Sequence, residues 1–186
     1  MPTAILLLAA GASRRFGAAN KLLAPLEGRP LLRNAADAAR AVPADLYLAV
    51  VSDPAVEALL PDFRTVRVDP GQPQSESLKA GLALAQAMGA ARLLVVLADM
   101  PRVPAALMSE VLAKGAIHPA AATDGTRILP PVCLPATIFL EIQSLAGDQG
   151  AGALLKNLPA SQRVLASAAI LTDIDTEADL AALALP

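Results

Sequence analysis

One segment near the start of the chain combines small residues, glycines and cations in an order that suits phosphate binding. It spans residues 8–17, is followed by Lys21, and comes directly after an apolar stretch typical of a buried strand. Small residues after a strand let backbone N–H groups approach a ligand, and Gly11 and Gly17 permit backbone angles that other residues resist. Arg15 and Lys21 add positive charge. The segment predicts either a phosphate-binding turn or an ordinary loop with solvated cations.

Neither of two widespread phosphate-binding patterns is present in this segment. The chain has no G-x-x-x-x-G-K-[ST], and G-x-G-x-x-G is absent because Ala9 and Ala12 stand where glycines would be needed. A phosphate site here would therefore differ from the P-loop and from the dinucleotide-binding turn.

A single carboxylate, Asp99, follows the apolar run at residues 93–97 and precedes Met100 and Pro101. An acid at the carboxyl end of a central parallel strand faces the crevice where such sheets bind ligands. It can hold Mg²⁺ against nucleotide phosphates, because this cation takes oxygen ligands. Residue types alone favour another role, in which Asp99 caps a helix that begins at Pro101.

Two further acids, Asp173 and Asp175, flank Ile174 near the end of the chain. In a strand, their side chains would point the same way. If that strand ends beside Asp99, one of them would supply a second acidic contact to the same metal ion. Turns and helix caps also use aspartate, so a purely structural role stays open.

A polar, proline-containing loop at residues 69–76 leads into a helical pattern that begins at Ser77. The loop backbone and the Ser77 hydroxyl could contact a base edge and a ribose, because a helix N-terminus offers free N–H donors. Ser77 also fits a simple helix cap at the end of a surface loop. The two roles are compatible.

The remaining reactive side chains give little support to other chemistries. Cys133 is expected to be a small core residue, because no histidine partner accompanies it. His118 is the only histidine and precedes Pro119 in an expected loop. A Ser-His-Asp hydrolase and a histidine-based metal site are therefore poorly supported.

Strand-like apolar runs alternate with helical patterns in the first half of the chain. We expect strands at 4–8, 46–51, 65–68 and 93–97, and helices at 31–41, 55–60 and 77–88. The apolar runs are short and mostly unalternating, as expected for strands covered on both faces. This order predicts an α/β fold with a mostly parallel sheet and helices on both sides.

The second half of the chain is less regular. We expect helices at 104–114, 138–145 and 150–158, and strands at 120–123, 131–134 and 169–174. Thr176 and Asp179 resemble a capping box that opens a terminal helix through Leu185. No internal repeat, long linker or low-complexity tail interrupts the sequence, so residues 1–186 are predicted to form a single domain.

The composition argues against several classes of protein. Hydrophobic residues make up 55% of the 186, but 42 residues are alanine, and no uninterrupted run reaches the ~20 apolar residues of a membrane span. A net charge of −2 with three Phe and one Tyr disfavours nucleic-acid binding. The N-terminus lacks the basic flank of a signal peptide, and a single cysteine excludes an internal disulfide framework. We expect a soluble cytoplasmic domain.

The motifs together resemble those of the MobA-like nucleotidyltransferases. The family's opening signature, L-A-[AG]-G-x-S-x-R-M-G followed by Lys, is matched by residues 8–17 and Lys21. Phe16 replaces the methionine, and Asn20 stands where an aspartate is common. The Ala-Ala-Gly form, with Lys-Leu-Leu after it, looks more like the molybdenum cofactor cytidylyltransferases than the guanylyltransferases. The family's [CA]-D-[MQ]-P segment is matched at 98–101.

Other segments match the family less closely. Residues 173–180 follow D-[IV]-D-T-P-E-D-L without its proline, and residues 71–82 follow G-[QM]-x-x-S-[LI]-x-x-G-[LI] with two extra residues. In the second half, residues 129–134 and 146–151 resemble acceptor-binding segments, but Gly152 replaces the arginine of G-D-x-G-A-R. This change could weaken a contact to an anionic pterin phosphate.

The resemblance implies a Rossmann-like three-layer sandwich of nucleotidyltransferase type, with a nucleotide-binding half at 1–102 and an acceptor-binding half at 103–186. It implies transfer of CMP from CTP to molybdopterin or molybdenum cofactor with release of pyrophosphate and with Mg²⁺ as cofactor. A recipient molybdoenzyme is a further possible partner.

The implied catalytic residues are Arg15, Lys21 and Asp99, and the implied metal ligands are Asp99 and Asp175. The implied nucleotide-binding residues are Ala9, Ala10, Gly11, Ala12, Gly71 and Ser77. Polar candidates in the acceptor half are Arg127, Asp148 and Lys156.

Two alternatives stay open at this point. The same chemistry could use GTP, or a sugar or polyol phosphate as acceptor. The chain could also be a non-catalytic protein that binds the pterin and delivers it to a molybdoenzyme, a role that Gly152 leaves open.

Overall fold

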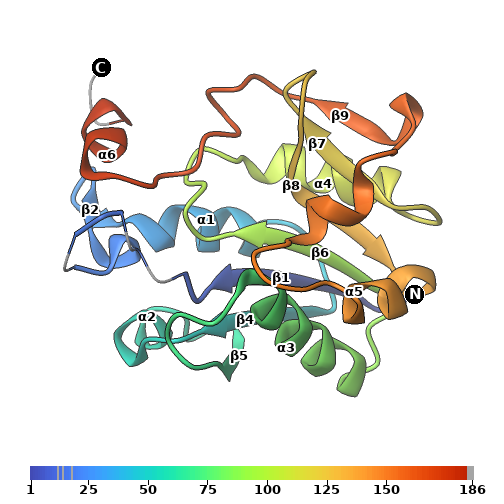
Figure 1. Cartoon of the computed structure of the whole chain (residues 1–186), viewed down its shortest axis with the longest axis horizontal. Helices are drawn as coiled ribbons and strands as arrows, with labels where there is room; N and C mark the ends of the chain where they lie inside the picture. Colours follow the sequence, from blue (N-terminus) through green and yellow to red (C-terminus); the bar gives the residue numbers. More distant parts are fainter. Residues whose placement is uncertain (12, 14, 18, 184–186) are drawn as a thin grey trace.

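The computed structural model describes residues 1–183 except 12, 14 and 18 (Figure 1). Ala12, one of the expected nucleotide-binding residues, lies outside the described residues. The expected end of the terminal helix at Leu185 lies outside them as well.

Seven described strands form one central sheet in the order β5-β4-β1-β6-β8-β7-β9. Their bounds are β1 (Thr3–Ala9), β4 (Leu46–Val51), β5 (Arg64–Arg67), β6 (Arg92–Leu97), β7 (Ala120–Thr123), β8 (Ile128–Pro135) and β9 (Arg163–Leu165). The pairs β1–β4, β1–β6, β4–β5 and β7–β9 are parallel, whereas β8 runs antiparallel to both of its neighbours. The prediction of a mostly parallel sheet is confirmed.

Helices cover both faces of this sheet (Figure 1). On one face lie α1 (Leu31–Arg40) and α4 (Ala105–Lys114), and on the other lie α3 (Gln74–Ala87) and α5 (Phe139–Gln143). The short helix α2 (Pro54–Ala58) follows β4. The last helix, α6 (Glu177–Leu183), lies away from the sheet, beside the small ribbon of β2 (Pro25–Leu26) and β3 (Arg29–Pro30). The three-layer α/β sandwich is therefore confirmed.

The central strand β1 shows why the apolar runs do not alternate. Ile5 and Leu7 pack into the core beneath α1 and α4, and Leu6 and Leu8 pack into the core beneath α3 and α5. Every residue of β1 is buried. Because both faces are covered, the strand has no position for a solvent-facing polar residue.

Cys133 on β8 is confirmed as a core residue. Its thiol lies 3.4 Å from the Gly115 carbonyl and has no exposed surface. Burial raises the pKa of this thiol to about 11, so the group stays protonated at neutral pH and is a poor nucleophile.

The predicted strand at 169–174 is wrong. The Thr172 hydroxyl donates to the Ala168 carbonyl, and Ile170 and Leu171 donate backbone N–H groups to the Ser167 carbonyl. These local bonds form turns in place of a strand ladder. The last described strand is β9, beside β7, and the helix predicted at 150–158 is the shorter 3-10 turn Ala151–Leu155.

The capping box at the start of α6 is confirmed. The Asp179 backbone N–H donates to the Thr176 hydroxyl at 3.1 Å, and the Thr176 N–H donates to the Asp179 carboxylate at 2.8 Å. The Thr176 hydroxyl and the backbone N–H groups of Thr176 and Asp175 all donate to the Asp179 carboxylate and lower its pKa. None of the helices in the described part of the chain is long and apolar enough to cross a membrane.

Gly81 allows α3 to lie close to the sheet, and its replacement gives a test of this packing. A Cβ at position 81 would lie 2.5 Å from Leu6 Cδ2 and 2.9 Å from Val50 Cγ2. We expect Gly81→Ala to lower the free energy of unfolding by about 1–3 kcal/mol, because the buried neighbours must shift. The higher helix propensity of alanine, worth about 1 kcal/mol, offsets part of this loss. Urea denaturation measures the difference.

A second background serves as the control for this experiment. Leu6→Val shortens the side chain that the new methyl group would meet, so Gly81→Ala should cost less in that background. Equal losses in the two backgrounds would contradict the packing explanation.

Candidate active site

Lys21 is buried although it carries a charge. Its residue is only 6% exposed, and its Nζ donates to Asp99 Oδ2 at 2.7 Å, to the Ile174 carbonyl at 2.7 Å and to Asp175 Oδ1 at 3.3 Å. The beginning, middle and end of the chain thus meet at one ammonium group. Burial by itself would lower the pKa of Lys21, but the two carboxylates outweigh it and raise this pKa. Lys21 is therefore charged at neutral pH.

Local hydrogen bonds hold Lys21 at the start of the 3-10 turn Lys21–Leu23. The Asn20 side chain accepts from the Leu22 N–H at 3.0 Å, and the Ser13 hydroxyl accepts from the Lys21 N–H at 3.2 Å. Asn20 also donates its side-chain amide to Asp53 Oδ2 at 2.9 Å. That bond and the Ala55 N–H lower the pKa of Asp53. An ionised aspartate at position 20 could accept from Leu22 but could not donate to Asp53.

Asp99 lies at the edge of the sheet where β1 and β6 both end. The Ala98 N–H donates to the Leu8 carbonyl, which extends the β1–β6 ladder up to Asp99. The alternative role of Asp99 as a helix cap is wrong, because α4 begins at Ala105 and Pro104 occupies its N-cap position. The side chain of Asp99 is free of that role and pairs with Lys21 instead.

Asp175 reaches the same place from the end of the chain, although not from a strand. The Ile174 N–H donates to the Asp99 carbonyl at 2.9 Å, and this bond sets the next residue beside Lys21. Arg15 Nη2 pairs with Asp175 Oδ2 at 2.7 Å. Asp173 is exposed, so of the two predicted acids only Asp175 contacts the cations.

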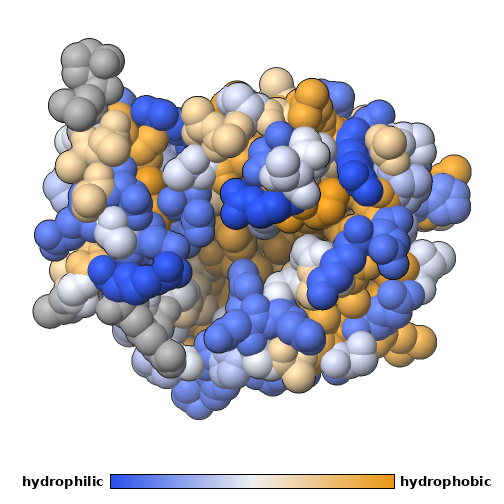
Figure 2. Space-filling model, turned by 45° about the horizontal axis from the view of Figure 1, so that its top comes forward, coloured by the Kyte–Doolittle hydropathy of each residue, from blue (hydrophilic) through white to orange (hydrophobic). Residues whose placement is uncertain are grey.

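These groups line a pocket of about 310 Å³ at the carboxyl ends of β1 and β6. Its lining includes the sequence-predicted residues Ala10, Gly11, Arg15, Lys21, Gly71, Ser77, Asp99 and Asp175. Ala9 is buried within β1 and does not line it. Figure 2 shows a face of the molecule that is hollowed at its centre, with hydrophobic side chains on the floor and hydrophilic ones around the opening.

Four polar residues of the lining are not among the nucleotide-site residues predicted from the sequence: Ser13, Gln72, Gln74 and Asp148. Asp148 was expected among the acceptor contacts, but it lines the same pocket as Asp99. The other two acceptor candidates are not in this lining: Arg127 pairs with Asp124 at 3.3 Å, and Lys156 is exposed. The Gly-Asp-x-Gly pattern around Asp148 was the signal that could have placed it.

The start of α3 forms another wall of the pocket. This helix begins at Gln74, so the prediction that Ser77 caps it is wrong; Ser77 lies in its first turn and is buried. The Ser75 N–H donates to the Gly147 carbonyl at 3.2 Å. A Cβ at Gly150 would lie 2.8 Å from Gln74 Oε1. Residues 146–150 therefore pack directly against the start of α3.

The pocket offers oxygen atoms that suit a divalent cation. In the part of the chain that the structure describes, no three or more His, Cys, Asp or Glu side chains form a metal-binding group. Asp99 and Asp175 are two carboxylates directed at one point, the Lys21 ammonium. Mg²⁺ is commonly bound by one or two carboxylates together with substrate phosphates and water. The donor set fits that kind of site.

A comparison with protein families matches the MobA-like NTP transferase domain to residues 5–164. The chain belongs to this family. Its relative in Bacillus subtilis (strain 168), the purine catabolism protein PucB, is 30% identical over 162 residues, which cover 81% of this chain and 78% of PucB. This MobA-like chain is a nucleotidyltransferase, and its substrate class is a nucleoside triphosphate.

Solved structures share the fold along the whole chain. Rv0371c from Mycobacterium tuberculosis H37Rv has a TM-score of 0.86 and 25% identity, with 99% of this chain and 98% of that chain covered. A complex of the same mycobacterial protein with manganese has a TM-score of 0.79 and 23% identity, covering 98% of each chain. A nucleotidyl transferase from Methanothermobacter has a TM-score of 0.81 and 22% identity, covering 98% of this chain and 95% of that one.

Lys21 and Arg15 both pair with Asp175 but differ in burial, which gives a matched test of the site. The side chain of Lys21 is 8% exposed and that of Arg15 is 73% exposed. We expect Lys21→Met to lower the free energy of unfolding by about 3 kcal/mol, because it removes the buried ammonium that pairs with Asp99 and Asp175. Arg15→Met should cost less than about 1 kcal/mol, as is usual for exposed ion pairs. Denaturant titration of both variants measures this, and similar losses would refute the distinction.

Proposed function

We propose that this chain transfers CMP from CTP to the terminal phosphate of molybdopterin or molybdenum cofactor, with release of pyrophosphate. The observation that carries the proposal is the meeting of Arg15, Lys21, Asp99 and Asp175 in one pocket. Two cations suit a triphosphate, and two acids suit its accompanying metal ion. The Ala-Ala-Gly start of the first loop and the Lys-Leu-Leu at 21–23 support CTP over GTP, because they resemble the cytidylyltransferase branch.

In this proposal the nucleotide lies along the first loop. Backbone N–H groups of Ala10 and Gly11, which line the pocket, would contact its phosphates. Arg15, exposed at the pocket, would reach the outer phosphates once its bond to Asp175 is exchanged. Gly71 and Ser77 would contact the ribose or the base. Gly71 has φ +80°, a conformation that favours glycine.

Asp99 and Asp175 would hold the metal ion, proposed to be Mg²⁺. When bound, the ion would neutralise negative charge on the α-phosphate and on the departing pyrophosphate. The complex of the mycobacterial protein with manganese supports a divalent cation in this fold.

The chain's own residues would act mainly by position and charge. The acceptor phosphate would attack the α-phosphorus in line with the leaving pyrophosphate, and no covalent intermediate with the protein is needed. Arg15 and Lys21 would stabilise charge that develops on the phosphates. In a partly buried pocket, charges interact more strongly than they do in water, which increases the effect of these cations.

The acceptor half contributes Asp148 to the same pocket. A carboxylate repels phosphate but accepts hydrogen bonds, so Asp148 suits an amino group such as that of a pterin.

Gly152, in place of the family's arginine, lies close to the Ile128 carbonyl, where a Cβ would be 3.6 Å from the oxygen. This is an ordinary van der Waals distance, so a Cβ would fit at position 152. Steric exclusion of a side chain therefore does not explain why this chain has glycine there.

Pyrophosphate release measures the nucleotide preference. With molybdopterin as acceptor, we expect CTP to give at least tenfold higher kcat/KM than ATP, GTP or UTP. Preference for GTP would assign a guanylyltransferase, and release only with a sugar or polyol phosphate would reassign the acceptor. Tight pterin binding without release from any of the four nucleotides would favour the delivery protein.

Two substitutions test the named catalytic residues. We expect Asp99→Ala and Lys21→Ala each to lower kcat by about 10²–10³-fold, a loss typical for removal of one charge-stabilising group. Arg127→Ala is the matched control, because Arg127 pairs with Asp124 outside the pocket. Wild-type turnover in either variant, at equal folding, would remove that residue from the mechanism.

A further inference from the structure

The ammonium group of Lys21 has no hydrogen-bond donor left for a substrate. A lysine ammonium has three N–H donors, and Lys21 Nζ contacts three oxygens: Asp99 Oδ2, Asp175 Oδ1 and the Ile174 carbonyl. Its side chain is 8% exposed. In this arrangement Lys21 lines the pocket but is fully engaged by the protein.

The same oxygens are those that a metal ion would use. Mg²⁺ and Mn²⁺ accept carboxylate and carbonyl oxygens, with Mg²⁺–O distances of about 2.0–2.1 Å. The ammonium of Lys21 lies 2.7 Å from Asp99 Oδ2 and 3.3 Å from Asp175 Oδ1. A divalent ion between these atoms would overlap the ammonium and would be repelled by its charge. Lys21 and a metal ion therefore cannot share the site.

We propose that Lys21 and a divalent cation compete for one set of oxygens, made up of Asp99, Asp175 and the Ile174 carbonyl. Entry of the metal releases the ammonium, which then becomes available to the phosphates of the nucleotide. This inference rests on the proposed function in taking these acids as the metal site. It adds the Ile174 carbonyl as a metal ligand. It also gives the Lys21 ammonium two positions, the first on the three oxygens and the second on the nucleotide phosphates.

The oxygens are held by bonds that do not involve the Lys21 side chain. The Ile174 N–H donates to the Asp99 carbonyl at 2.9 Å. The Asp175 N–H donates to Asp179 Oδ2 at 3.1 Å. When the ammonium leaves, the three oxygens remain together. They then form a negatively charged cluster with no cation at its centre, which is a strong site for a metal ion.

Competition of this kind couples the two ligands. Without nucleotide, a metal ion must displace the Lys21 ammonium from its oxygen partners, and the displaced ammonium gains no new partner. The metal ion alone therefore binds weakly. When nucleotide phosphates are present, the released ammonium gains a phosphate partner, and metal and nucleotide strengthen each other's binding. The site would therefore retain its metal only while a nucleotide is bound.

Binding of Mn²⁺ alone, measured by the electron paramagnetic resonance signal of free Mn²⁺, tests the competition directly. We expect Lys21→Met to bind Mn²⁺ at least tenfold more tightly than the wild-type protein. Lys114→Met, which removes a charge from the exposed end of α4, should bind like wild type. Adding Asp175→Asn to Lys21→Met should abolish the gain. Equal affinities of folded Lys21→Met and wild-type protein would overturn the proposal.

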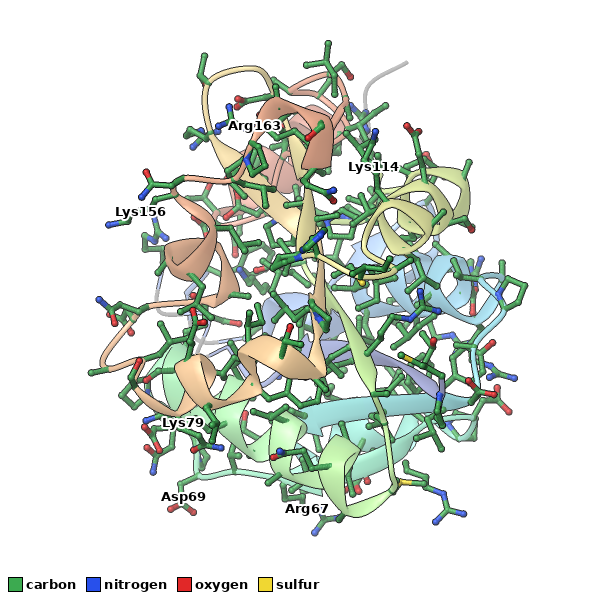
Figure 3. The ribbon with its side chains drawn as sticks, turned by 90° about the vertical axis from the view of Figure 1, so that its right-hand side faces the viewer. Arg67, Asp69, Lys79, Lys114, Lys156 and Arg163 are labelled. Atoms are coloured by element: carbon green, nitrogen blue, oxygen red, sulfur yellow. The ribbon has the colours of Figure 1, made fainter. Side chains whose placement is uncertain are left out.

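A measurement on the wild-type protein covers the case in which Lys21→Met does not fold. An amine-reactive reagent followed by mass spectrometry reports the exposure of each lysine. Figure 3 shows the other three, Lys79, Lys114 and Lys156, on separate elements at the outside of the molecule. We expect Mn²⁺ to raise labelling of Lys21 at least threefold and to leave these three unchanged. No rise at a concentration where Mn²⁺ is bound would overturn the proposal.

The two proposals can fail separately. An active cytidylyltransferase whose Lys21→Met variant binds Mn²⁺ no more tightly would reject the competition and keep the proposed function. Tighter Mn²⁺ binding by that variant, in a protein that releases no pyrophosphate from any nucleotide, would reject the proposed function and keep the competition.

Discussion

The arrangement of the described structure around the pocket depends on one buried ammonium group. A charged side chain away from water is costly unless oppositely charged and polar groups surround it. Lys21 meets this requirement with Asp99 from the end of β6 and with Asp175 and the Ile174 carbonyl from the segment before α6. These contacts therefore hold residues 174–175 beside the first loop. They join the first loop to residues that are remote in sequence, and they do so inside the pocket.

The sheet provides the fixed frame for this cluster. Because β1 and β6 are parallel neighbours, their carboxyl ends open at the same edge, which brings the first loop next to Asp99. The alanine-rich composition serves this frame. Ala35, Ala36 and Ala39 form much of the buried side of α1, and Gly81 lets α3 approach β1. Small residues bring helices close to the sheet, so these alanines contribute to close packing in this part of the molecule.

Much of the fold was predictable because it depends on local patterns. Apolar runs marked β1, β4 and β6, and the spacing of Thr176 and Asp179 predicted the capping box. The strand prediction at 169–174 was wrong because the Ser167 and Ala168 carbonyls accept hydrogen bonds from this segment and form turns. The sequence alone does not show whether such a segment bonds locally or to a neighbouring strand. In the pocket, Arg15, Lys21 and Asp99 could be found from their motifs. The Gly-Asp-x-Gly pattern marks Asp148 as a site residue, but its place beside Asp99 depends on how residues 146–150 pack against α3.

The bond between Asn20 and Asp53 has a consequence for the history of the family. It joins the turn that holds Lys21 to the N-cap of α2, through an amide that donates to a carboxylate. An acid at position 20 would face the Asp53 carboxylate with two like charges, and an amide at position 53 would remove that conflict. The two positions are therefore expected to vary as a pair among relatives, with an acid at one of them at a time. Such covariation would indicate that relatives keep the contact between positions 20 and 53, which orients the first loop.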